Sequence, residues 1–95
     1  MIQQQAPDII PQGPVAIDLW FYLPIPKSWP KYRKAKADQE IMPHSVRPDL
    51  SNLVKLVEDA AESILYDDDK QIVSIRTNKH YSPQPRTEIV MQWDF

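Results

Sequence analysis

Hydrophobic and polar residues alternate along the chain from residue 15 to residue 23. One set of this alternation comprises Val15, Ile17, Leu19, Phe21 and Leu23, and the other comprises Ala16, Asp18, Trp20 and Tyr22. A period of two with aromatic enrichment predicts a β-strand, and the apolar members of both sets predict that both strand faces are substantially covered. The prolines at positions 24, 26 and 30 predict the end of this strand.

Apolar residues then recur at intervals of three and four between residues 50 and 65. This spacing predicts one amphipathic helix that ends near Leu65. Asp49 follows Pro48 and is the expected N-cap, because a carboxylate there can accept hydrogen bonds from the first-turn amides. Ser51 is the alternative cap.

Two further strands are predicted, at residues 71–78 and 88–93, separated by Ser82, Pro83 and Pro85. Two strands joined by a short connection most simply form an antiparallel hairpin. The predicted fold class is therefore α+β, a small mixed or antiparallel sheet with one main helix packed on one face. Residues 1–95 are expected to form a single domain, with a long, basic and mobile loop at residues 24–47.

The composition excludes several classes of protein. The 95 residues include no cysteine, which excludes a disulfide framework and a cysteine-based zinc site. No apolar stretch is long enough for a membrane span, and the N-terminus shows no signal-peptide pattern. A cytoplasmic protein without membrane partners is the expectation that follows.

The distribution of charge is more informative than the net charge of −2. Residues 27–36 contain five basic side chains and no acid, whereas residues 56–69 contain six acids and no base. Such segments are most often solvated surfaces. The same pair of segments also fits a nuclease, in which cations hold phosphates and carboxylates hold metal ions.

The residues best suited to chemistry flank the predicted helix. Asp49 and Asp69 are suited to a divalent cation beside Lys55, because hard cations prefer oxygen ligands. They lie at opposite ends of the predicted helix, so they can share one cation only if the chain folds back along it. Simpler interpretations stay open at this point. Asp49 can be a cap, residues 67–69 a solvated turn, and Lys55 and Asp59 a surface ion pair.

The spacing of these polar residues resembles the RusA family of crossover junction endodeoxyribonucleases, from about residue 13 to the end. The pattern is carried by Asp49, Asn52, Lys55, Asp59, Asp68, Asp69 and Gln71, and by the strand between Gly13 and Lys27. The resemblance implies a Mg²⁺- or Mn²⁺-dependent nuclease that resolves Holliday junctions and related branched DNA in recombination and repair. It also implies a homodimer.

The resemblance assigns roles residue by residue. Asp49, Lys55 and Asp69 match the catalytic residues, and Asp49, Asp69 and Asp68 match the metal-binding carboxylates. Ser51, Asn52 and Asp59 are expected to play supporting roles. We expect the DNA backbone to be bound by basic side chains, namely Lys31, Arg33, Lys34, Lys36 and Lys79.

Two departures from the family pattern bear on activity. Ser51 occupies a position where the family has an aspartate, and a serine binds metal more weakly. Family members usually begin with a further strand and helix, which this chain is expected to lack. A catalytically inactive RusA-like DNA-binding module is therefore the alternative, and an acidic protein-interaction domain is a third hypothesis.

Overall fold

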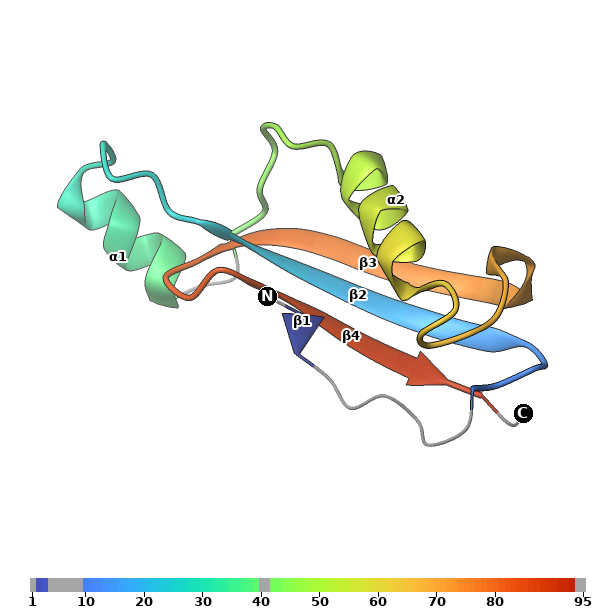
Figure 1. The fold of residues 1–95 in the computed structure, drawn as a ribbon. Helices are drawn as coiled ribbons and strands as arrows, with labels where there is room; N and C mark the ends of the chain where they lie inside the picture. The colour runs from blue at the N-terminus through green and yellow to red at the C-terminus, as the bar shows by residue number, and fades with distance from the viewer. Residues whose placement is uncertain (1, 4–9, 40–41, 94–95) are drawn as a thin grey trace.

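The computed structural model describes residues 2–3, 10–39 and 42–93. A four-stranded mixed sheet has the strand order β1-β4-β2-β3, with α2 lying across one face (Figure 1). The elements are β1 (Ile2–Gln3), β2 (Val15–Pro24), α1 (Lys31–Gln39), α2 (Leu50–Ala61), the 3₁₀ turn η1 (Asp69–Gln71), β3 (Ile72–Ser82) and β4 (Arg86–Gln92). The predicted α+β class is confirmed.

The core lies between α2 and one face of β2. Alternate β2 residues from Val15 to Phe21 are buried there, and Val57 and Ala61 of α2 pack against them. The opposite face of β2 is only half-buried. The prediction that both faces are substantially covered therefore holds for one face, because no described helix packs on the other.

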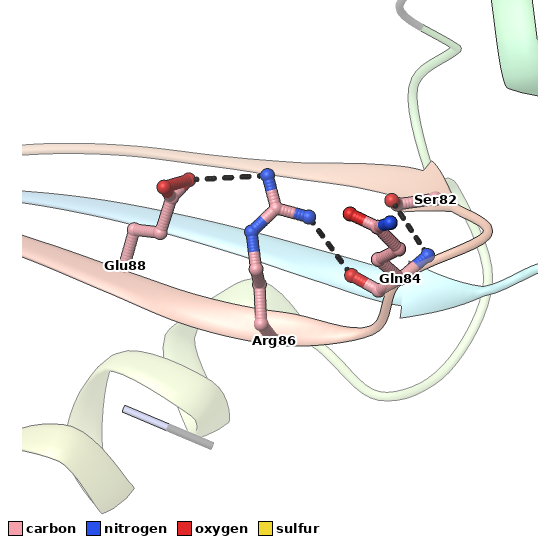
Figure 2. A network of polar contacts seen from close by, with 4 residues as sticks. All are labelled: Ser82, Gln84, Arg86 and Glu88. Carbon is pink, nitrogen blue, oxygen red and sulfur yellow. Dashed lines mark hydrogen bonds and ion pairs between the residues drawn. The ribbon is translucent and has the colours of Figure 1, made fainter. Parts of the chain in front are cut away.

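The predicted hairpin between the last two strands is wrong. β2 separates β3 from β4, and it pairs parallel with β3 and antiparallel with β4. The chain between Ser82 and Arg86 must therefore cross two strand spacings, about 10 Å, which the three connecting residues can span when extended. Polar contacts fix this crossing (Figure 2), from the Gln84 amide to Ser82 and from Arg86 to the Gln84 carbonyl and Glu88.

The segment predicted as a long loop contains the nine-residue helix α1. Its start is fixed by the Pro30 carbonyl, which accepts hydrogen bonds from the amides of Arg33 and Lys34 at 3.1 Å. Among the residues of α1, all of them described, only Ala37 is buried, so the sequence carried no apolar periodicity to predict this helix. Residues 40–41 of the predicted loop lie outside the described residues, and its mobility stays a prediction.

Helix α2 ends at Ala61, earlier than the predicted end near Leu65. Glu62 is extended and Ser63 has a φ of 69°, so the chain turns sharply. Leu65 and Tyr66 are nevertheless buried, because this turn folds them under the helix into the core. The place of Leu65 in the apolar pattern thus reflects burial beyond the end of the helix.

The buried side chain of Gln71 joins three separate parts of the fold. Its Oε1 accepts hydrogen bonds from the amides of Asp67 and Asp68, both at 2.9 Å. Its Nε2 donates to the carbonyls of Pro11 at 2.8 Å and Gly13 at 2.9 Å. One side chain thereby ties the turn after α2 to the segment that enters β2.

We expect Gln71→Ala to lower the free energy of unfolding by on the order of 3 kcal/mol, because four backbone groups lose a partner and some stay shielded from water. Chemical denaturation monitored by circular dichroism measures this. Gln12→Ala is the matched control on the exposed neighbouring segment and should change stability by less than about 0.5 kcal/mol. Equal effects of the two substitutions would refute the role given to Gln71.

Candidate acidic site along helix α2

Asp49 is the N-cap residue of α2, as predicted, but its side chain does not act as a cap. The backbone is extended at this position, and no capping hydrogen bond is made by the carboxylate in the described structure. Asp49 instead lines an open cavity of about 570 Å³ together with Arg47, Pro48 and Asn52. Its oxygens are therefore available to a ligand.

Asp69 lies beyond the opposite end of the helix, in η1. Its backbone N–H donates to Glu62 Oε2 at 3.3 Å. Its Oδ1 is buried and has no hydrogen-bond partner among the described residues. The nearby Tyr66 hydroxyl donates to the backbone carbonyl of Glu58 at 3.4 Å, and it lies close enough to Asp69 for that carboxylate, after burial, to raise the pKa of the phenol. A buried carboxylate oxygen without a partner is a costly arrangement that a bound cation would relieve.

Three carboxylates and a tyrosine gather around this end of α2. Burial, and then the charge of Asp69, raise the pKa of Glu58, while Lys55 opposes the rise. The charge of Asp69 is the main cause that raises the pKa of Glu62. Burial raises the pKa of the Tyr66 phenol, and the neighbouring Asp69 adds to the effect. Asp69 therefore contributes to all three raised pKa values, after burial at Glu58 and Tyr66 and as the main cause at Glu62.

Asp49 and Asp69 do not converge within one chain, which corrects the expected folding back of the chain. The twelve residues of α2 rise by about 18 Å. Asp49 begins this helix, and Asp69 is bonded to Glu62 at its end. Two carboxylates this far apart cannot both reach one Mg²⁺ ion, whose ligands lie at about 2.0–2.1 Å.

The other predicted site residues are spread between these two ends. Ser51, Asn52, Lys55 and Asp59 are exposed on α2. Ser51, Lys55, Glu58 and Glu62 follow one another at three- or four-residue spacing and so form a polar stripe along the helix. Asp68 caps η1 by accepting a hydrogen bond from the Lys70 amide at 2.9 Å, so one of its oxygens is already used.

One chain by itself does not fit a complete metal centre. Across the described ranges, no three His, Cys, Asp or Glu side chains are arranged to hold a metal ion. Asp69 Oδ1, buried and unpaired, fits a single ligand position, and Asp49 offers another at the far end of α2. The donors are divided between two half-sites.

The five predicted DNA-binding residues occupy two different settings. Lys31, Arg33, Lys34 and Lys36 all lie on α1, where the guanidinium of Arg33 lies 3.8 Å from the ring centre of Trp29. Lys79 is on β3, and its amine donates to backbone carbonyls. Helix α1 is therefore the main basic surface found among the described residues.

Sequence reasoning missed Glu58, Glu62 and Tyr66 as members of the acidic site. Glu58 and Glu62 are three and seven residues after Lys55 and therefore share its helix face. That spacing was a usable signal. Tyr66 carried none, because only the turn after Ala61 brings its hydroxyl to the helix.

We expect Asp69→Asn to stabilise the fold at pH 7, raising the melting temperature by a few degrees in the presence of EDTA. The charge of Asp69 raises the carboxyl pKa values of Glu58 and Glu62 in the folded state, so native stability falls as the pH rises through their titration. The gain should disappear once these glutamates are protonated at acid pH. Calorimetry at both pH values measures it.

Asp67→Asn is the matched control, since Asp67 is exposed in the same turn and is not among the causes of either glutamate's pKa shift. It should leave the melting temperature nearly unchanged. A loss of stability in Asp69→Asn at pH 7 would contradict the proposed repulsion.

Comparisons with known proteins identify the family to which the chain is similar. The family model described as endodeoxyribonuclease RusA matches residues 1–92, a longer stretch than the sequence pattern alone indicated. A Bacillus subtilis (strain 168) protein, "Uncharacterized protein YqaN", is 38% identical over 91 residues, which cover 94% of this chain and 64% of the relative. The chain thus spans less than two thirds of that relative's length.

No solved structure matches the chain. No helix in the described residues has both the length and the apolar character needed to cross a membrane. The match to the family model covers nearly the whole sequence, and it includes both ends of α2. The chain belongs to the RusA family of endodeoxyribonucleases.

Proposed function

We propose that this protein is a Mg²⁺- or Mn²⁺-dependent endonuclease that resolves Holliday junctions and related branched DNA by phosphodiester hydrolysis. Its role is in DNA recombination and repair in the cytoplasm. The observation that carries the proposal is Asp69 Oδ1, a buried carboxylate oxygen inside an acidic cluster that has no hydrogen-bond partner in the described part of the chain. Membership in an endodeoxyribonuclease family supports a role for that oxygen as a metal ligand.

The proposed metal centre is completed by two chains. Asp49 and Asp69 are separated by the length of α2 within one chain, so they reach a common ion only if Asp49 comes from one protomer and Asp69 from its partner. A two-fold homodimer would make two such centres, because each chain contributes both of its half-sites. Two centres suit a four-way junction, which is resolved by a cut in each of two strands.

The chain's own side chains position the DNA and balance its charge. Asp49 and Asp69 would hold the cation, and Asp68 would be available through its second oxygen. When bound, the cation supplies Lewis-acid stabilisation of the charge that develops on the scissile phosphate. Lys55 extends from the exposed side of α2, and its ammonium stabilises the same charge or orients the attacking water.

Helix α1 holds the DNA backbone in this proposal. Its four basic side chains contact phosphates, which gives affinity that depends on salt and not on sequence. Arg33 is already oriented by its packing on Trp29. Asn52 and Asp59 support the site from the exposed surface of α2, near Asp49 and Lys55 respectively.

Cleavage of a labelled four-way junction tests this function. The wild-type protein should cut in Mg²⁺ or Mn²⁺ and not in EDTA, and Asp69→Asn or Asp49→Asn should lower the rate at least a hundredfold. A heterodimer of the two variants, purified with two different tags, should nick one strand, because one composite centre remains intact. If each centre lies within one chain, the same heterodimer carries a lesion in both centres and stays inactive.

Ser51→Asp tests the alternative of an inactive DNA-binding module, which is favoured by the serine at this position. The new carboxylate should lower the Mg²⁺ concentration that gives half-maximal cleavage by about tenfold, because magnesium sites commonly use one or two carboxylates. It should also raise stability by about 0.5 kcal/mol, because the first turn of α2 has no acidic residue.

Ser74→Asp, at an exposed position on β3, is the control for added charge. It should leave the Mg²⁺ requirement unchanged. Salt-dependent junction binding without cleavage by the wild type, together with cleavage by Ser51→Asp, would identify an inactive module that has lost one ligand. The absence of junction binding at any ionic strength would support the acidic protein-interaction domain.

A further inference from the structure

Lys79 makes an unusual pair of contacts for a lysine that is expected to bind the DNA backbone. Its side chain leaves β3, and its Nζ donates to the backbone carbonyl of Val46 at 2.7 Å and to that of Pro48 at 2.7 Å. Both carbonyls belong to the segment that leads directly to Asp49. Two of the three ammonium donors are thus used inside the protein.

The same segment is attached to β3 along its backbone. The His44 amide donates to the Lys79 carbonyl at 3.1 Å, and the Tyr81 amide donates to the Met42 carbonyl at 3.0 Å. The imidazole of His44 is buried, with its ring centre 4.7 Å from that of Tyr81. Residues 42–44 are therefore fixed on the edge of β3, and the Lys79 side chain extends this attachment to Pro48.

Asp49 is consequently held from both sides. Its own carbonyl accepts a hydrogen bond from the Leu53 amide at 3.1 Å, which fixes it to the first turn of α2. On the other side, the preceding carbonyl of Pro48 is bonded to Lys79. The Asp49 carboxylate takes no part in capping, so these backbone contacts are what determine where it points.

We infer that Lys79 is a positioning residue that orders the segment before Asp49, and that it is not a contact to the DNA backbone. The inference rests on the proposed function in one respect, since Asp49 must be a metal ligand for its position to affect cleavage. A charged donor shared by two carbonyls forms stronger hydrogen bonds than a neutral one, and this makes the ammonium group essential to the arrangement.

Lys79→Met tests the inference, because methionine keeps much of the apolar stem and removes the donors. With saturating protein, the single-turnover rate of junction cleavage should fall at least tenfold. Backbone ¹⁵N relaxation should show lower order parameters for residues 45–47 and 49. The slope of log Kobs against log[salt] for junction binding should stay unchanged, because no phosphate contact is lost.

Two further variants separate positioning from phosphate binding. Lys79→Arg should recover most of the rate and the order parameters, because a guanidinium can also donate to two carbonyls. Lys31→Met, on the exposed start of α1, should reduce the magnitude of the salt slope by about 0.9, as expected for one lost phosphate contact. If Lys79→Met proves too unstable to purify, Lys79→Leu provides the same comparison, because leucine is also apolar and has no hydrogen-bond donor.

The inference is overturned if Lys79→Met reduces the salt slope as Lys31→Met does while the order parameters stay at wild-type values. A wild-type protein that binds but does not cut junctions would refute the proposed nuclease. The order parameters would still decide the role of Lys79, because they do not depend on cleavage. The two failures are therefore distinguishable.

Discussion

The fold depends on the hydrogen bonds of one buried amide, Gln71. Its oxygen and nitrogen each serve two backbone groups, and these come from segments nearly sixty residues apart in the sequence. A purely apolar contact at this place would leave the backbone groups without partners. The amide also sets the position of Asp69, because Asp69 lies within the short turn that Gln71 closes.

The acidic cluster of Glu58, Glu62 and Asp69 holds mutually repelling carboxylates close together, and the rest of the fold keeps them there. Glu58 and Glu62 are fixed by α2, and Asp69 is fixed by the turn, so the three carboxylates cannot move apart freely. Burial and then the charge of Asp69 raise the pKa of Glu58, and the charge of Asp69 is the main cause that raises the pKa of Glu62. Perturbed carboxylates concentrated in one place are typical of sites that bind cations or substrates.

The sequence predicted those features whose cause is local. The alternation in β2 and the apolar spacing of α2 reflect burial on one face, so both elements were found. Helix α1 was missed, because it buries only Ala37 and so lacks an apolar face. The pairing of β2 with both later strands depends on contacts far apart in sequence, which no local pattern encodes. The separation of Asp49 from Asp69 follows instead from the length of α2, because Asp69 lies beside Glu62 at the far end of that helix.

The placement of β2 between β3 and β4 affects how the protein is made. This strand is synthesised early, yet both of its partners come from the last quarter of the chain. Its apolar residues therefore leave the ribosome long before the strands that pair with it. The sheet can form only after β3 and β4 have been synthesised. Until then β2 is an unpaired apolar segment that is prone to aggregation.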